Sequence, residues 1–450
     1  MRVAVVGGGI SGLSVAHFLK RAGAEVMVFE KNGTPGGTIG TRMTEGFLVE
    51  SGPSSTSETN FVIDEMLADL GMKDEKVYAN DGSKYRYIVR GGELHALPGG
   101  PGSFISTRLW SARAKFRLLG EPFIGRATRE ESIAEFVKRR LGREFLDYAI
   151  NPFVAGVYAG NPSDLSVRAA FPKLYALEEK YGGLLKGTLQ GARERRKRAD
   201  KAKVSAKLVS FKSGMGVLPS TIAKSLDDAV LFNTPVISVK LESACYRLGF
   251  VEKGKTSGEV FDSVVLSTPA YSAAQIIRSW LPELSEQLSS IKYPPVAVAI
   301  LGYKLSQVEM DLNGFGFLVP EVEKRKILGT IWSSSIFPNR APEGSVELTT
   351  FVGGSRQPGL ASLPADEIAG IAHGENSSLM MISGEPTFNS VTRWEKAIPQ
   401  YNIGHLSIVE SVKHVESVYK GFYICSNYRD GISVADCIAN GKRTAEKILE

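Results

Sequence analysis

A glycine-rich turn near the N-terminus constrains the fold more than any other feature of the chain. Residues 2–6 are an apolar, β-branched run, the pattern Gly-x-Gly-x-x-Gly occupies 7–12, and a helical pattern begins at Ser11. A second apolar run at 25–29 ends at Glu30. Such glycines permit a tight turn, let phosphate approach the backbone and let the helix pack on the strand, while the acid binds an adenosine ribose. The pattern predicts a dinucleotide at the helix N-terminus, and a purely structural glycine turn is the alternative.

A second glycine pair, Gly36-Gly37, indicates which dinucleotide is bound. It is followed by a strand-like segment at 41–50 and then by Gly52-Pro53. NAD needs no second close approach of the backbone at this point. FAD is longer, and its ribityl chain and isoalloxazine ring extend away from the first turn, so further backbone has to line it. The pair therefore favours FAD over NAD.

Composition and length exclude several classes of protein. The 450 residues are 43% apolar and 23% charged, which is typical of a globular protein with two or three domains. The longest apolar run, 294–303, is too short to span a membrane, and Met1 leads directly into the first strand, so we expect a cytoplasmic protein without a targeting segment. The three cysteines form no Cys-x-x-Cys pair and the five histidines have no metal-ligand spacing, so we expect no metal.

The region from 99 to about 200 has a mostly helical pattern. Leu109, Ala112, Phe116 and Leu119 would share one helix face, with basic side chains on the others. This pattern is typical of a helix on an anionic membrane surface and equally of a helix packed on the core. Both interpretations stay open.

Two further segments of this region have a specific interpretation. Thr128 and Glu131 match a helix capping box ahead of a helical run at 133–141. The basic run at 193–203 has no interleaved aromatic residues, so we interpret it as a solvated helix face rather than a nucleic-acid site.

Strand patterns return in the second half of the chain. Strands alternate with helices over 207–290, several strands fill 295–352, and a strand at 422–426 precedes a closing helix over 434–448. The predicted fold class is α/β (α+β overall), a Rossmann-like FAD-binding domain combined with a second, sheet-based region and a helical insertion.

Several longer segments resemble one enzyme family. GGGISGL (7–13), NPFVAGVYAGNPSDLSVRAAFPKL (151–174), LGTIWSSS (328–335), TTFVGGSR (349–356) and GISVADCI (431–438) are similar to segments of the flavin-dependent protoporphyrinogen oxidases, within the wider amine-oxidase-like flavoproteins. The resemblance runs over nearly the whole chain. It implies an FAD domain built from 1–80, 205–290 and 405–450, a substrate domain from 81–98, 180–204 and 291–404, and a helical, membrane-associating part over 99–179.

The resemblance also implies a set of site residues. The expected FAD contacts are Gly7, Gly8, Gly9, Ile10, Ser11, Gly12, Glu30, Lys31, Gly37, Thr38, Gly52, Pro53, Ser54, Ser55, Val236, Asn427, Ile432, Ser433 and Val434. In the substrate pocket, Arg86 would pair with a propionate, and the backbone carbonyl of Gly156 would face pyrrole N–H groups. Leu318, Ile331 and Phe351 would sandwich the tetrapyrrole.

The implied reaction is the six-electron oxidation of protoporphyrinogen IX to protoporphyrin IX, with hydride transfer to the flavin and O2 as acceptor, giving H2O2. No residue is singled out as catalytic, because the flavin performs the chemistry. A coproporphyrinogen III oxidase, an FAD amine oxidase and a non-catalytic binder like the GDP-dissociation inhibitors remain alternatives. A membrane surface and a second copy of the chain are further partner expectations, while nucleic acid is not expected.

Overall fold

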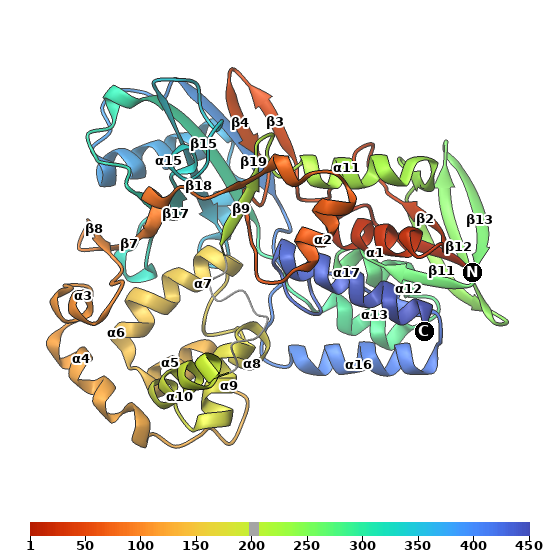
Figure 1. Ribbon diagram of the computed structural model, residues 1–450, viewed down its shortest axis with the longest axis horizontal. Helices are drawn as coiled ribbons and strands as arrows, with labels where there is room; N and C mark the ends of the chain where they lie inside the picture. The colour runs from red at the N-terminus through yellow and green to blue at the C-terminus, as the bar shows by residue number, and fades with distance from the viewer. Residues whose placement is uncertain (198–206) are drawn as a thin grey trace.

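The computed structural model describes residues 1–197 and 207–450. Two large sheets and a group of helices make up the molecule (Figure 1). The parallel sheet with its helices lies on the right of the view with both chain termini, and the antiparallel-rich sheet and the helical region lie on the left. In the described part of the chain, no helix is long and apolar enough to cross a membrane.

The first sheet is parallel and is assembled from distant parts of the chain. Its strands are β10 (Val230–Leu231), β2 (Glu25–Phe29), β1 (Arg2–Val6), β14 (Ser263–Leu266) and β20 (Phe422–Ile424), in that order. The central strands are buried on both faces, which explains their continuous apolar sequence. The predicted strand–helix–strand unit at the N-terminus is confirmed.

Helices and a small sheet cover the two faces of this parallel sheet. One face packs on α1 (Ile10–Arg21), α2 (Val62–Asp69), α11 (Val217–Leu226) and α17 (Val434–Leu449). The other face packs on α12 (Ala270–Ile277), α13 (Pro282–Ser289), α16 (His405–Val418) and the antiparallel sheet β11 (Val236–Glu242), β12 (Cys245–Glu252) and β13 (Lys255–Phe261).

The closing helix α17 packs directly against α1. A Cβ on Gly441 would lie 2.5 Å from the Ser14 Cβ, so glycine is needed for the close approach. The apolar residues Val434, Cys437, Ile438, Ala445 and Ile448 of this helix are all buried. The two ends of the chain are thereby joined beside the glycine turn.

The second large sheet has seven strands and one parallel pairing. The order is β19 (Phe388–Trp394), β15 (Val296–Lys304), β18 (Ser345–Gly353), β17 (Ile327–Ile331), β16 (Gly314–Leu318), β7 (Tyr85–Arg90) and β8 (Glu93–Ala96). Only β16 and β7 are parallel neighbours among these strands. Helix α15 (Ala365–Met380) packs on one face of this sheet, and α7 (Asn151–Tyr158) contacts β16 and β17.

Two small sheets connect the larger units. β3 (Thr41–Thr44) pairs with β4 (Phe47–Glu50), and β9 (Leu208–Phe211) lies between β5 (Thr56–Ser57) and β6 (Lys76–Tyr78). Helix α14 (Ser333–Ile336) follows β17 and packs on β18. These elements lie where the two large sheets meet.

The helical region differs in detail from the sequence prediction. Its helices are α3 (Pro101–Ser106), α4 (Ala112–Arg117), α5 (Ile133–Arg140), α6 (Arg143–Phe145), α7, α8 (Val167–Ala170), α9 (Pro172–Tyr181) and α10 (Leu184–Lys197). Helix α10 packs on α9, within this region rather than on the seven-stranded sheet. The side chains of the whole basic run at 193–203 lie outside the described part of the structure.

The predicted single apolar face over Leu109, Ala112, Phe116 and Leu119 is wrong. The segment is broken before α4, because Ser111 caps that helix by accepting a hydrogen bond from the Ala114 N–H. Leu109 is fully buried, whereas Phe116 and Leu119 are 71% and 70% exposed.

The predicted capping box at Thr128 and Glu131 is also wrong. Helix α5 instead begins with a box four residues later, in which Ser132 and Glu135 bond each other's backbone N–H groups. The helical run that the box was expected to open does form.

Candidate functional site

The N-terminal glycine turn has the geometry of a phosphate-binding loop. Gly7 has φ +111° and donates a hydrogen bond to the Phe29 carbonyl at 2.8 Å. A Cβ on Gly12 would lie 2.1 Å from the Gly7 carbonyl oxygen, so no other residue fits there. The Gly8 N–H donates to Glu30 Oε2 at 2.7 Å, which fixes the acid at the end of β2. The turn thus leaves the N-terminus of α1, whose first backbone N–H groups have no intrahelical partner, accessible to a ligand.

The two glycine turns lie against each other. The Gly36 N–H donates to the Gly8 carbonyl at 2.8 Å, and an ideal Cβ on Gly37 would lie 3.5 Å from the Gly9 Cα. A Cβ on Gly9 would meet no atom within 4 Å, because this position faces open space. Backbone at Gly9 and Gly37 is therefore accessible to a phosphate.

A cavity of about 560 Å³ lies beside these turns. Its size matches a large cofactor rather than a small substrate. Predicted contact residues from both ends of the chain line it: Gly7, Gly9, Ile10, Ser11, Glu30, Lys31, Gly37, Thr38, Pro53, Val236, Asn427, Ile432 and Val434. The cavity does not border the other predicted contacts, Gly8, Gly12, Gly52, Ser54, Ser55 and Ser433.

Some of these other residues support the wall of the cavity. Ser433 caps α17 by accepting a hydrogen bond from the Asp436 N–H at 3.1 Å, which sets the direction of the helix that carries Val434. A Cβ on Gly52 would lie 2.2 Å from the Thr38 carbonyl oxygen. These contacts shape the cavity without facing it.

The cavity also contains polar groups that sequence reasoning missed. The hydroxyls of Ser267 and Thr268 are buried, line the cavity and have no hydrogen-bond partner among the described residues. Buried hydroxyls left unpaired cost free energy, so their presence at the wall fits a polar ligand. The Thr268-Pro269 dipeptide, which follows β14, is the sequence signal nearest to them.

Aromatic and basic side chains form another part of the wall. Lys396 lies over the Tyr271 ring at 4.2 Å, and both residues line the cavity with Trp394. The Trp394 indole N–H donates to the Ser51 carbonyl at 2.7 Å, which ties β19 to the segment before Gly52. A long, partly apolar cavity with phosphate-accessible backbone, a carboxylate and unpaired hydroxyls fits FAD.

The predicted substrate side chains share one face of the seven-stranded sheet. Arg86 pairs with Gly316, which pairs with Ile331, and Leu318 pairs with Gly329, which pairs with Phe351. Residues in register, and residues two apart on a strand, project from the same face. Arg86, Leu318, Ile331 and Phe351 therefore project from one face, opposite to the apolar face that α15 covers.

Helix α7 meets this face at Gly156. A Cβ at that position would lie 2.7 Å from Leu318 Cδ2, so the helix backbone packs directly on Leu318. Arg86 is exposed and its guanidinium lies 5.2 Å from the centre of the Phe315 ring. The structure thus places Arg86, Leu318, Ile331 and Phe351 on one face of the sheet, and Gly156 against Leu318 of that face.

Comparison with known proteins identifies the family. The family model described as flavin-containing amine oxidoreductase matches residues 10–449. Protoporphyrinogen oxidase 2 of Arabidopsis thaliana is 33% identical, over 100% of this chain and 94% of that protein. Coproporphyrinogen III oxidase of Bacillus subtilis is 29% identical, over 99% of this chain and 97% of the relative. The chain therefore belongs to the flavin-containing amine oxidoreductases and, within them, to the protoporphyrinogen oxidase family.

Solved structures agree in fold. A protein from Exiguobacterium sp. 255-15, described as a candidate protoporphyrinogen oxidase, has a TM-score of 0.82 at 23% identity, covering 100% of this chain and 99% of that one. Putrescine oxidase bound to putrescine has a TM-score of 0.68 at 17% identity, covering 100% and 99%. Its membership of the family makes the protein a flavin-dependent oxidoreductase, as predicted.

Proposed function

We propose that the protein oxidises protoporphyrinogen IX to protoporphyrin IX. The observation that supports this best is the common face of the seven-stranded sheet, which carries an exposed arginine and three apolar side chains, one of which, Leu318, contacts the backbone of α7. A flat, apolar macrocycle with propionates needs apolar walls and a cation. The names of several relatives, among them the Arabidopsis and tobacco proteins, point to the same substrate.

In this proposal the residues of the chain orient the substrate. A bound flavin would supply a hydride acceptor with O2 as the final oxidant, so the six-electron oxidation would give one porphyrin and three H2O2. Arg86 binds a propionate, Gly156 presents its carbonyl to the pyrrole N–H groups, and Leu318, Ile331 and Phe351 exclude water from the ring. Positioning of the reacting carbon supplies the rate enhancement, with no acid–base pair required.

Coproporphyrinogen III oxidation is the second candidate, since relatives from Bacillus subtilis and Staphylococcus aureus have that name. An aerobic assay with each porphyrinogen distinguishes the two. We expect porphyrin fluorescence to rise with protoporphyrinogen IX, together with about three H2O2 per porphyrin formed. Turnover of coproporphyrinogen III alone would reassign the substrate, and turnover of neither would refute the proposal.

We also propose that the helical region contacts an anionic membrane surface. Four large apolar side chains on and around α3 and α4 are 70% to 89% exposed: Ile105, Phe116, Leu119 and Phe123. Exposed arginines accompany them, at 108, 113, 117 and 126. Exposed aromatic and aliphatic groups beside cations are typical of interfacial binding. Trp110, in contrast, is buried on Phe145 and belongs to the core.

A further inference from the structure

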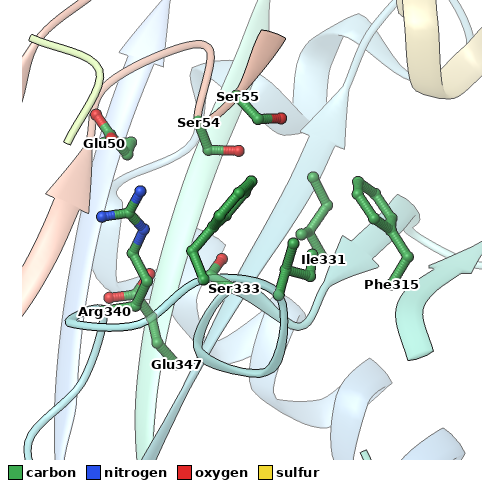
Figure 2. Close-up of a pocket in the computed structure, with 10 residues that line it drawn as sticks. Glu50, Ser54, Ser55, Phe315, Ile331, Ser333, Arg340 and Glu347 are labelled. Carbon is green, nitrogen blue, oxygen red and sulfur yellow. The ribbon is translucent and has the colours of Figure 1, made fainter. Parts of the chain in front are cut away.

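A buried cluster of charged groups lies between the cofactor segment 52–55 and the seven-stranded sheet. Glu50 ends β4, Arg340 follows α14, and Glu347 lies in β18; they are 3%, 1% and 1% exposed. Figure 2 shows the Arg340 side chain between Glu50 and Glu347, with Ser54 and Ser55 nearby. Isolated buried charges are costly, so a cluster of three requires an explanation.

Glu50 and Arg340 form hydrogen bonds that connect the cluster to the segments around Met215 and around Ser54. Glu50 accepts hydrogen bonds from the Met215 N–H at 2.8 Å and from the Thr41 hydroxyl. The Arg340 guanidinium donates to Ser210 Oγ at 2.7 Å. The Ser210 hydroxyl in turn donates to the Ser54 carbonyl at 2.8 Å. Arg340 is thereby connected through one side chain to the segment 52–55.

The third member has an unsatisfied oxygen. Glu347 Oε2 and Arg340 Nε are both buried, and neither has a hydrogen-bond partner among the described residues. Both residues line a cavity of about 10 Å³, together with Ser54, Ser55 and Ile331. A cavity of that volume holds about one water molecule, and two unpaired polar atoms are the partners that such a water needs.

Charge balance decides the protonation of the cluster. Two ionised carboxylates with one guanidinium would leave a net negative charge in the protein interior. Burial raises the pKa of Glu347 well above its usual range and the Glu50 charge adds to the rise, while the Arg340 charge and a hydrogen bond with Ser333 lower this pKa less strongly. Burial also raises the pKa of Glu50, but hydrogen bonds from Thr41 and the Met215 N–H lower it. The proton therefore belongs on Glu347, where the hydroxyl can donate to a water.

We propose that Glu50, Arg340 and Glu347 form a charge-neutral positioning site: an ionised Glu50 and Arg340, an uncharged Glu347, and one water bridging Glu347 Oε2 to Arg340 Nε. The site fixes the segment 52–55, of which Pro53 borders the large cavity and Ser54 and Ser55 border the small one. By fixing this segment, the site determines the position of the flavin and the electrostatic potential around it. The inference rests on the flavin assignment and is independent of which porphyrinogen is oxidised.

The test compares two matched carboxamide variants of the holoprotein, Glu347→Gln and Glu50→Gln. Glutamine has the shape and charge of the protonated acid, so Glu347→Gln should leave the flavin midpoint potential unchanged between pH 6 and pH 9. Among the described residues, the charged groups that act on Glu347 are Arg340 and Glu50. Glu50→Gln leaves Arg340 uncompensated, so it should raise the potential. Infrared spectra should show the carbonyl band of a protonated carboxylic acid, which Glu347→Gln should remove.

Arg340 is tested by its own pair of variants. Arg340→Met should lower the midpoint potential and weaken FAD binding about tenfold, the equivalent of one charge-assisted hydrogen bond. If that variant does not fold, Ser210→Ala removes only the connecting oxygen and should still weaken FAD binding. Equal shifts of potential in Glu347→Gln and Glu50→Gln would overturn the protonation assignment. Unchanged FAD affinity in the Arg340 or Ser210 variant would overturn the positioning role.

Discussion

At the residue scale, Gly9 is the position where a side chain should remove the cofactor without disturbing the protein. A Cβ there meets no atom within 4 Å, so Gly9→Leu should fold but fill the phosphate site with its branched end. The purified variant should be colourless, while its far-ultraviolet circular dichroism stays that of the wild type. Gly370→Leu is the control, because Gly370 is exposed on the outer face of α15 and also has open space around its Cα. A Gly9→Leu protein with a full complement of flavin would contradict the site.

Arg86 tests the substrate face. Its side chain is exposed, and Arg86→Ala should leave flavin content and stability unchanged. Loss of one charge-assisted hydrogen bond to a propionate should raise the KM for the porphyrinogen about tenfold. Steady-state kinetics measure this, with Arg247→Ala as the control, because the Arg247 side chain of β12 is also exposed. Unchanged kinetics would remove Arg86 from the pocket.

The sequence predicted some residues of the cavity and missed others. Gly7, Glu30 and Pro53 were predicted because each belongs to a local pattern. Ser267 and Thr268 were missed because they are ordinary residues at a strand end, and only the parallel pairing of β14 with β1 brings them to the cavity. The buried Arg340 cluster has no local signal, since its members come from three separate segments.

At the element scale, the exposed apolar groups around α4 should control membrane association. The triple variant Phe116→Glu, Leu119→Glu and Phe123→Glu should reduce flotation with anionic liposomes, because the carboxylates replace the apolar groups that would be buried and are repelled by the anionic lipids. Val418→Glu is the control, because Val418 is 55% exposed on the distant α16. Equal flotation of the two variants would refute the membrane proposal.

Helix α16 should make stability dependent on pH. Burial lowers the pKa of His405 at its start to about 4, below the ordinary value of 6.5. The unfolded state therefore binds the extra proton first, and stability is full above about pH 6.5 and falls as the pH drops toward 4. At about 1.4 kcal/mol per pKa unit, the loss is on the order of 3 kcal/mol. Urea unfolding from pH 7 to pH 4 should show a shallower fall for His405→Gln; parallel curves would contradict this.

Elements were predicted best where periodicity was long and uninterrupted. The strand–turn–helix at the N-terminus and the closing helix agree with the structure because their apolar patterns coincide with their buried faces. The segment around Leu109 failed because Ser111 begins a new helix, so residues with helical spacing do not share a helix. The order of strands in the seven-stranded sheet could not be read from the sequence, since β7 pairs with a strand more than 200 residues away.

At the scale of the whole molecule, the cofactor cavity lies between the two ends of the chain. Removal of FAD should lower the Tm, because a ligand that binds only the folded state stabilises it by mass action. Added FAD should restore the Tm in a concentration-dependent manner, because a hundredfold excess over its Kd stabilises the folded state by about 2.7 kcal/mol. Differential scanning calorimetry measures this. A Tm independent of FAD would contradict a cavity that connects both ends.

The most direct test of the central claim is the reduction of the bound flavin by a porphyrinogen without oxygen. The purified yellow protein is mixed anaerobically with protoporphyrinogen IX, and separately with coproporphyrinogen III, while the flavin absorbance is followed. We predict that protoporphyrinogen IX bleaches the flavin rapidly and that air restores the colour. A flavin that coproporphyrinogen III alone bleaches, or that neither compound bleaches, would contradict the account.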